Sequence, residues 1–374
     1  MGYWIGLGKE RQRGERRLKE RMRDEEYMRL VLKLAQRGKG KTSPNPLVGA
    51  LVVRKGEIVG KGYHQRAGGK HAEIIALDRA KEKAKGATLY VNLEPCASYG
   101  RTPPCVDRII KQGIRRVVIG MIDPNPLNRG KGIRRLRANN IAVKVGVLQE
   151  EAERINRFWS SFITQGKPYV ILKIAQSLDG QISTCTGDSK WITSSGARRY
   201  VHRLRTEVDA VLVGINTVLK DNPLLSARLG EKKLYRHQPI KVVLDSHLRI
   251  PLNAKLFSSP GALLIATTSS APVKRIKELE RRGARVLMVR KEKKKVSMRD
   301  LMQILAKEGI VSILIEGGRE VFISAIESRI VDEVQVFIAP KIIGRVSKVS
   351  QAFPISNIRT ERIGKDLLIR GECR

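Results

Sequence analysis

The chain has few cysteines, few aromatic residues and no long apolar run, and these shortages exclude several classes of protein. Its 374 residues include only four cysteines, at positions 96, 105, 185 and 373, which are too few for a disulfide framework. No run approaches the roughly 20 apolar residues of a membrane-spanning helix, and no segment has the apolar core and cleavage site of a secretory signal. We therefore expect a cytoplasmic protein without a membrane role.

Acidic residues are also scarce, because 36 Asp and Glu face 73 Lys and Arg and leave a net charge of +37. Such a charge favours polyanions, acidic lipid surfaces and phosphorylated small molecules. The basic residues are spread along the chain, with local densities at 9–23, 274–286 and 289–296. Aromatic residues make up only 5% and no recognised nucleic-acid-binding motif occurs, so we interpret the charge as a solvated surface and expect no nucleic-acid partner.

The length and the 41% apolar content suit two compact domains, each with its own core. Residues 1–23 are dense in charge without periodicity, which predicts a basic arm with little fixed structure. Met22 directly precedes the first well-patterned helix and is a candidate start of translation. From 24 to 150, Val- and Ile-rich strands alternate with helical patterns, which indicates a layered α/β domain.

The second half repeats this alternation without repeating the sequence. Residues 151–168 read as a connecting helix that ends at Gly166 and Pro168. Over 169–374, short Val, Ile and Leu runs bounded by turns favour a mostly parallel sheet that is covered on both faces. The fold class is therefore α/β with two domains.

The segment PCASYGRTPPC (95–105) places Cys96 and Cys105 nine positions apart, and upstream the tripeptide HAE opens a helix with His71 and Glu73. One imidazole and two thiolates suit a tetrahedral zinc whose fourth position is open for water. Zinc lowers the pKa of that water, and the Glu73 carboxylate can carry its proton to a leaving amine. This order of residues is the signature of zinc deaminases.

Two details of this region stay open from the residues alone. The common signature has two residues between the cysteines, whereas here there are eight, and the prolines and Gly100 would let the longer loop return to one ion. His64 and Asn45 lie nearby in sequence, and each is a candidate either for orienting a pyrimidine or for capping a turn.

The stretches TSPNPLVGALVV, GYH, GGKHAEIIAL, LEPCASYGRTPPC and IDPNPLNRGKGIRRL together resemble the deaminase half of the bifunctional riboflavin-biosynthesis deaminase-reductases, over residues 24–149. The resemblance implies a cytidine-deaminase-like αβα domain that deaminates 2,5-diamino-6-(5-phosphoribosylamino)pyrimidin-4-one. It also accounts for the long cysteine spacing. Ser98 stands where members commonly have histidine, and since it is not one of the three presumed ligands we expect altered substrate contacts rather than lost catalysis.

In the second half, the sequence IEGG precedes a helical pattern at 319–328, and a glycine turn at a helix N-terminus can hold a pyrophosphate. Such a turn alone is weak support, because many loops use glycine only for its positive φ. The chain has no G-x-G-x-x-G in the expected setting, which disfavours a standard dinucleotide-binding fold.

Segments 173–193, 213–228, 242–246 and 313–321 resemble the reductase half of the same family, whose fold is similar to dihydrofolate reductase. The resemblance implies NADPH as hydride donor and reduction of the ribosyl group to give 5-amino-6-(5-phosphoribitylamino)uracil. The cofactor contacts that it implies are Ala175, Trp191, Thr217, Asp221, Ser246, Gly317 and Gly318. The substrate contacts that it implies are Ser189, Arg205, Leu225, Arg228 and Glu316.

The side chains themselves favour some of these roles. Arg205 and Arg228 can form the paired, charge-assisted hydrogen bonds that a terminal phosphate accepts. Trp191 can stack on a ring or fill the core. Lys173 and Asp179 flank the expected nicotinamide region, where they can assist proton delivery or form structural pairs. The hydride comes from the cofactor, so the protein contributes orientation and electrostatics.

Two other functions fit parts of the sequence. A deaminase of tRNA type with an accessory basic domain would use the same HAE motif and the net charge of +37, and would bind RNA in a strongly salt-dependent way, but the second half would have no role. A scaffold that has lost catalysis would not need all three zinc ligands and Glu73. We therefore predict a bifunctional enzyme with one zinc and NADPH, a phosphorylated pyrimidine substrate and a homo-oligomeric state.

Overall fold

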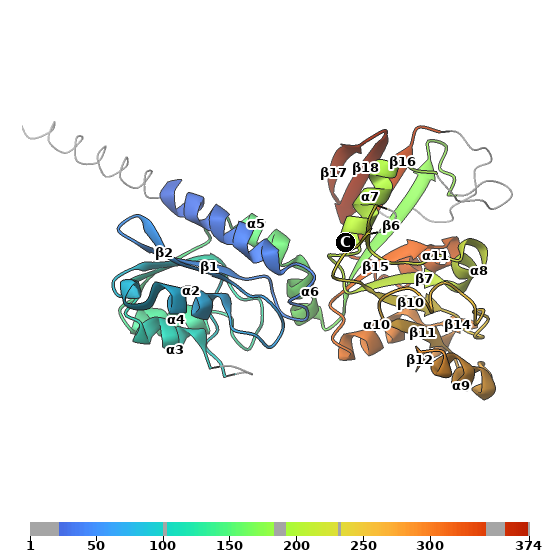
Figure 1. The fold of residues 1–374 in the computed structure, drawn as a ribbon, viewed down its shortest axis with the longest axis horizontal. Coiled ribbons are helices and arrows are strands. Elements are labelled where there is room, and N and C mark those ends of the chain that lie inside the picture. The colour runs from blue at the N-terminus through green and yellow to red at the C-terminus, as the bar shows by residue number, and fades with distance from the viewer. Residues whose placement is uncertain (1–21, 100–102, 183–191, 231–232, 342–355, 373–374) are drawn as a thin grey trace, which may run out of the picture. The chain divides into compact units, whose positions relative to one another are not determined.

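The computed structural model describes residues 22–99, 103–182, 192–230, 233–341 and 356–372. The chain divides into two compact units, Met1–Thr164 and Gln165–Arg374 (Figure 1). Each unit has its own sheet and its own core. Within the described ranges, no helix combines the length and the apolar character that crossing a bilayer requires.

The first unit is built on a five-stranded sheet in the order β2-β1-β3-β4-β5. Strands β3, β4 and β5 run parallel, whereas β1 is antiparallel to both β2 and β3. The apolar residues of β1 and β3 are buried on both faces, as expected for a sheet between two helical layers. The strands are β1 (Gly49–Arg54), β2 (Glu57–Tyr63), β3 (Thr88–Leu93), β4 (Arg116–Met121) and β5 (Ala142–Val145).

Helices cover both faces of this sheet and make the αβα layering that the sequence predicts (Figure 1). Gly62 in β2 has no side chain, and an added Cβ would lie only 2.4 Å from the Ala72 carbonyl oxygen of α2. On the opposite face, Gly49 gives the same close approach to the helix of residues 22–35. The remaining elements are η1 (Gln36–Gly38), α2 (Ala72–Ala80), η2 (Lys81–Ala84), α3 (Cys105–Lys111), α4 (Lys131–Ala138), α5 (Gln149–Ile155) and α6 (Arg157–Gln165).

The segment 151–168, expected to be one connecting helix, differs from that expectation. It contains the end of α5 and then α6, with a break at Asn156. The Asn156 side chain accepts a hydrogen bond from the Leu47 amide at 2.8 Å and donates one to the Leu47 carbonyl at 3.0 Å. The break is thus held by a tertiary contact 109 residues away, which helical periodicity does not reveal.

The second unit is built on a nine-stranded sheet in the order β12-β11-β10-β7-β15-β6-β16-β18-β17. The first seven strands in this order are parallel, which confirms the predicted mostly parallel sheet. These strands are β6 (Tyr169–Ser177), β7 (Ala210–Gly214), β10 (Ile240–Leu244), β11 (Leu263–Thr267), β12 (Ala284–Met288), β15 (Ser312–Gly317) and β16 (Glu333–Ala339).

Two strands at one edge, β17 (Ser356–Ile363) and β18 (Asp366–Glu372), form an antiparallel hairpin on β16. Sequence patterning missed this pair because β17 is exposed along most of its length and therefore lacks an apolar face. Two short hairpins complete the strands, and they consist of β8 (Arg228–Leu229) with β9 (Lys233–Leu234) and of β13 (Lys291–Glu292) with β14 (Lys295–Val296).

Five described helices accompany this sheet, namely α7 (Ser195–Leu204), α8 (Ile215–Asp221), α9 (Val273–Arg281), α10 (Met298–Lys307) and α11 (Arg319–Glu327). Strand β15 lies between β7 and β6, although both precede it in the chain. Helix α8 follows β7 and α11 follows β15, so two helices begin at neighbouring carboxyl ends of the sheet. In open α/β sheets such a point is where ligands bind.

Candidate active sites

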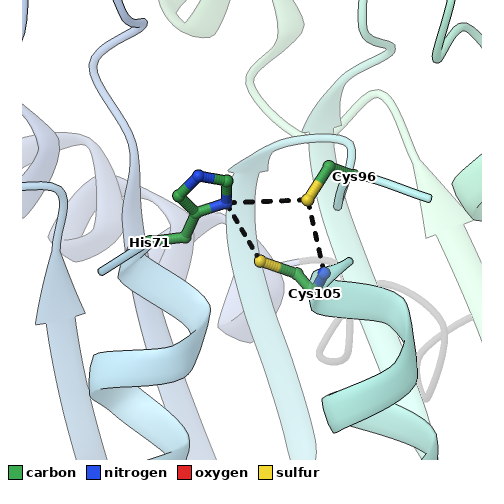
Figure 2. Close-up of side chains that lie close together, drawn as sticks. All are labelled: His71, Cys96 and Cys105. Atoms are coloured by element: carbon green, nitrogen blue, oxygen red, sulfur yellow. Dashed lines mark hydrogen bonds between the residues drawn. The ribbon is translucent and has the colours of Figure 1, made fainter. Parts of the chain in front are cut away.

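The three predicted zinc ligands come together at helix ends in the first unit. His71 precedes the first residue of α2, Cys96 follows β3, and Cys105 is the first residue of α3. The His71 Nδ1 atom lies 3.2 Å from the Cys105 Sγ and 3.6 Å from the Cys96 Sγ. Figure 2 shows the imidazole and both sulfurs pointing toward one another. The ligand atoms all lie within 4.8 Å of one another, so the eight-residue loop does bring both sulfurs to one point.

This donor set fits a zinc ion. Both thiols are free, and a hydrogen bond from Cys105 together with the His71 imidazole lowers the pKa of Cys96 to about 4. The hydrogen bond to Cys96 in turn raises the pKa of His71 to about 9. A sulfur that already carries negative charge, next to a second sulfur and an imidazole nitrogen, is a site for a borderline-soft cation.

Glu73 lies in the first turn of α2 and is buried, with 4% of its surface exposed. Its carboxyl group is hydrogen-bonded to the Cys105 side chain, so it lies directly beside the ligand cluster. Burial raises the pKa of Glu73, which makes this carboxyl group a better proton acceptor than an exposed one.

The two residues whose role the sequence left open also lie at this cluster. The His64 ring meets the His71 ring edge-on, with 5.7 Å between the ring centres. Its Nδ1 is 3.0 Å from the Lys70 carbonyl oxygen, and its Nε2 is 3.0 Å from the Asn45 Nδ2. Because a carbonyl only accepts, Nδ1 carries the proton and Nε2 accepts from the Asn45 amide. Burial lowers the pKa of His64, which favours this neutral form.

Sequence reasoning missed Glu94, a buried carboxylate two residues before Cys96. It accepts backbone hydrogen bonds from Asp123 at 3.2 Å, Gly130 at 2.9 Å and Ile133 at 3.2 Å. These bonds tie the end of β3 to the loop and helix that follow β4, and so they fix the start of the Cys96 loop. The Pro95-Cys96 motif identified Cys96 as a candidate ligand, but no sequence pattern indicated a role for Glu94.

Asn128 holds the other side of the same loop. Its Oδ1 accepts from the Ala97 amide at 2.7 Å, and its Nδ2 donates to the Asp123 carboxylate at 2.7 Å. The IDPNPLN stretch is therefore a support for the metal loop, a role that its sequence alone did not indicate. Ser98, the departure from the family pattern, donates to the Leu127 carbonyl at 3.3 Å and is exposed.

In the second unit a cavity of about 890 Å³ opens at the carboxyl ends of β7, β10 and β15. Four of the predicted cofactor residues line it, and they are Thr217, Asp221, Ser246 and Gly318. Its volume is within the range of ligand pockets that take cofactors. The cavity thus joins segments that lie about a hundred residues apart in the sequence.

The Gly317–Gly318 turn is crowded by Thr217. A Cβ added at Gly317 would lie 3.2 Å from the Thr217 Oγ1, and one added at Gly318 would lie 3.1 Å away. Glycine at both positions therefore lets α8 and the start of α11 approach each other at the cavity. Ala175 is placed differently, because it lies in β6, packs against the cluster around Phe337 and is not one of the residues that line the cavity.

The predicted substrate residues Arg205 and Glu316 form a two-bonded ion pair. The Arg205 Nε and Nη2 donate to the two Glu316 carboxylate oxygens at 2.6 and 2.8 Å, and the Nη1 donates to the Ser226 carbonyl at 2.9 Å. Burial opposes the charge of Glu316, but Arg205 outweighs it and holds the pKa of Glu316 below its usual value. Arg205 is thus occupied by protein, whereas the sequence suggested that it holds a phosphate.

Arg228 is the less occupied of the two arginines. Its Nε is buried and has no hydrogen-bond partner among the described residues. Its backbone nitrogen lies 3.3 Å from the His202 Nδ1, which is also 3.2 Å from the Ser226 carbonyl oxygen. Burial lowers the pKa of His202 to about 4, which favours the neutral ring. The predicted contact Leu225 is 3% exposed, so its side chain belongs to the core.

Lys173 and Asp179 have different surroundings. Burial lowers the pKa of Lys173, and the nearby Glu316 carboxylate opposes that shift. Asp179 accepts a hydrogen bond from the Ser177 hydroxyl at 2.5 Å. Trp191 and Ser189, a predicted cofactor contact and a predicted substrate contact, lie outside the described residues.

Comparisons with known proteins match both halves. Residues 21–121 match the family described as "Cytidine and deoxycytidylate deaminase zinc-binding region", and residues 168–369 match the "RibD C-terminal domain". The chain is 45% identical to the riboflavin biosynthesis protein RibD of Aquifex aeolicus, over 92% of this chain and 97% of that protein. It is 43% identical to RibD of Escherichia coli, over 86% and 89%.

Solved structures agree with these matches over nearly the whole chain. Acinetobacter baumannii RibD is 34% identical with a TM-score of 0.84, covering 95% of this chain and 99% of that one. A diaminohydroxyphosphoribosylaminopyrimidine deaminase/5-amino-6-(5-phosphoribosylamino)uracil reductase from Thermotoga maritima is 35% identical with a TM-score of 0.81, covering 95% and 100%. With its deaminase zinc-binding region followed by a reductase domain, the chain belongs to the RibD family of riboflavin biosynthesis proteins.

Proposed function

We propose that residues 24–150 carry the deaminase site and residues 169–374 the reductase site of this bifunctional riboflavin biosynthesis enzyme. The first reaction removes an amine hydrolytically from 2,5-diamino-6-(5-phosphoribosylamino)pyrimidin-4-one. The second uses NADPH to reduce the ribosyl group and gives 5-amino-6-(5-phosphoribitylamino)uracil. The domain matches support this assignment of one activity to each half of the chain, because one match lies in each half.

In the deaminase, His71, Cys96 and Cys105 would hold the zinc ion. Zinc in such a site supplies Lewis acidity that makes hydroxide available near neutral pH. The Glu73 carboxylate takes the proton that water gives up and passes it to the departing amine. Its burial and its contact with Cys105 support this role.

Asn45 and His64 would orient the pyrimidine in the deaminase. The Asn45 amide already donates to His64, which fixes the side chain and leaves its carbonyl oxygen for a ring substituent. Glu94 and Asn128 are positioning residues that hold the Cys96 loop and touch no substrate.

In the reductase, bound NADPH supplies the hydride. The turn Gly317–Gly318 and the residues Thr217, Asp221 and Ser246 would hold it in the cavity at the carboxyl ends of the strands. Ala175 and Trp191 complete the proposed cofactor set by family resemblance alone.

The substrate side of the reductase lies around the Arg205–Glu316 pair. Arg228 is the better candidate for the phosphate, because its Nε has no protein partner within the described residues. Arg205 instead fixes the Glu316 carboxylate, which can then bind sugar hydroxyls. Lys173, beside Glu316 and with a lowered pKa, is a candidate to move a proton at the reacting sugar carbon. Ser189 and Leu225 remain proposed substrate contacts from the resemblance, and Asp179 remains a second candidate for assisting proton delivery.

We further propose that the enzyme works in the cytoplasm as a homo-oligomer. Free thiols at Cys96 and Cys105 favour a reducing compartment. The high positive charge is explained by a phosphorylated substrate and a phosphorylated cofactor, so a nucleic-acid partner is not needed.

The observation that carries the deaminase proposal is the imidazole nitrogen 3.2 and 3.6 Å from two sulfurs, with a buried carboxyl group beside them. The test is metal analysis of the purified chain before and after chelation, with ammonia release and NADPH oxidation followed in parallel. We expect about one zinc per chain and a chelation that stops ammonia release but leaves oxidation of NADPH with the deaminated substrate intact. Ammonia release that continues in zinc-free protein would contradict the assignment.

A further inference from the structure

The basic run KEKKK (291–295) has a defined place in the second unit. It forms the β13–β14 hairpin that follows β12 and precedes α10. Lys294 and Lys295 line the same cavity as Ser246 and Gly318, the proposed cofactor contacts. The hairpin therefore borders the cavity.

Several contacts hold the hairpin in this position. Val296 is buried in the core of the unit, and the Ser297 hydroxyl donates to the Glu292 carboxylate at 2.7 Å. The Lys295 ammonium donates at 3.0 Å to Glu320 in the first turn of α11. The tip is thus anchored both to the core and to the helix that begins at the Gly317–Gly318 turn.

The turn residues are unusual for a hairpin tip. Lys293 and Lys294 have φ values of 45° and 66°, a left-handed conformation that two-residue hairpin turns normally fill with Asn or Gly. A lysine at such a position is conformationally disfavoured. Both lysines are exposed, but Lys294 is one of the residues that line the cavity and Lys293 is not.

Lys294 is also available for a ligand. Within the described residues its ammonium has no hydrogen-bond or ion-pair partner, unlike Lys295, which is paired with Glu320. Arg249, in the loop after β10, lines the same cavity, and its Nη2 donates to the Asn216 side chain at 3.1 Å, which fixes the guanidinium. Two cations from different loops therefore border one cavity that also contains a helix N-terminus.

We propose that Lys294, together with Arg249, binds the 2′-phosphate of NADPH and so selects NADPH over NADH. The proposal rests on the reductase function above. The Gly317–Gly318 turn at the start of α11 suits the pyrophosphate. Lys294 and Arg249 are therefore available for another anionic group of the cofactor. The 2′-phosphate is that anion, and it is the one group by which NADPH differs from NADH. A dianionic phosphate gains most from charge-assisted hydrogen bonds to Lys and Arg.

The test compares Lys294→Ala with the matched control Lys293→Ala, which removes the same charge from the neighbouring turn position. The KM values for NADPH and for NADH are measured with the deaminated substrate, and binding of 2′,5′-ADP and 5′-AMP is measured as a probe of the phosphate alone. We expect Lys294→Ala to raise the KM for NADPH and to weaken 2′,5′-ADP by about tenfold. The values for NADH and 5′-AMP stay within about twofold, as do all values for Lys293→Ala. Arg249→Ala should show the same selective loss.

Two other results would overturn the proposal. If Lys294→Ala weakened NADPH and NADH equally, the lysine would act on the pyrophosphate or through general charge. If neither changed while the wild-type chain oxidised NADPH, the 2′-phosphate would lie elsewhere and the reductase function would stand. A wild-type chain that binds neither NADPH nor 2′,5′-ADP would instead overturn the reductase assignment itself, so the two failures are distinguishable.

Discussion

The deaminase site and the reductase site are built in opposite ways. The zinc cluster uses three side chains from a span of 35 positions. They converge because α2 and α3 begin near the point where the chain leaves β3. The cavity in the second unit draws its lining from residues 180 to 324, contributed by helices, loops and strand ends at the carboxyl edge of a wide sheet. The zinc cluster therefore depends on a few side chains, whereas the cavity depends on the arrangement of many segments at the carboxyl edge of the sheet.

This difference predicts different sensitivities. At the zinc cluster each proposed ligand and Glu73 would have a role that no neighbour can take over. In the cavity, binding is shared among backbone groups and several cations, so single changes should cost less and should alter selectivity before they abolish activity. The expected effects below follow that order.

The largest effect is expected for Glu73→Gln. The amide keeps the shape but cannot carry a proton, so ammonia release should fall by about a thousandfold while about one zinc per chain is retained. NADPH oxidation with the deaminated substrate should not change. Glu82→Gln, an exposed change in η2, serves as the control for loss of one acidic group. Zinc lost together with activity would assign Glu73 to the metal instead.

Gly317→Val tests whether NADPH oxidation can be lost while deamination is kept. The new side chain would meet Thr217, whose Oγ1 lies 3.2 Å from the position of a Cβ, and would push α8 and the turn apart. We expect the rate of NADPH oxidation to fall by about a hundredfold through misplacement of the cofactor. Gly317→Ala should be intermediate, and both variants should deaminate at the wild-type rate. A parallel loss of both activities would argue that the two sites are not independent.

Arg205→Lys should have a smaller effect, confined to the reductase. Lysine cannot make the two parallel bonds to Glu316, so this carboxylate should lose its fixed orientation. We expect kcat/KM for the deaminated substrate to fall by about tenfold with little change in the KM for NADPH. Arg203→Lys, an exposed change in the last turn of α7, should leave kcat/KM unchanged. A selective rise in the KM for NADPH would place Arg205 at the cofactor.

Asp24→Asn should affect stability in the first unit rather than chemistry. Burial opposes the charge of Asp24, but hydrogen bonds from Lys144 and Arg116 outweigh it and lower the pKa of Asp24. Losing the charge leaves two cations without their partner and should cost about 3 kcal/mol. Deaminase activity should then be lost on heating before NADPH binding, whereas Glu26→Gln, an exposed change, should not separate the two.

The pH dependence of that effect follows from the sign of the shift. Because the pKa of Asp24 is lower in the folded chain, its stabilisation is complete above the unfolded value of about 3.9. It is lost as the pH falls through the folded value. The difference in stability between wild type and Asp24→Asn should therefore shrink below about pH 4. A difference that stayed constant well below that pH would mean that packing, not charge, explains the loss.

The same contrast explains how far sequence could predict this molecule. His71, Cys96 and Cys105 were found because each metal ligand must be one of a few residue types in a fixed order. The parallel strands were found because they are buried on both faces and consist of short Val, Ile and Leu runs. Glu94 and Asn128 were missed because their partners are backbone groups, and any sequence supplies those.

In the second unit the prediction was less complete. Resemblance named Thr217 and Ser246, but only the strand order places them in one cavity. The β17–β18 pair went unnoticed because its edge strand is polar. That Arg205 pairs with Glu316 could not be derived from residue type, since an arginine suits a carboxylate and a phosphate equally well.

The most direct test of the two-site account is to supply the phosphoribosylated diaminopyrimidinone with and without NADPH and to identify the products by mass spectrometry. The account predicts that without NADPH the substrate loses one amine and keeps its ribosyl ring. With NADPH, the same deaminated compound should appear and then gain the mass of a reduced, open ribityl chain. A reduced product that still carries both amines, or no deamination by zinc-loaded protein, would contradict the account.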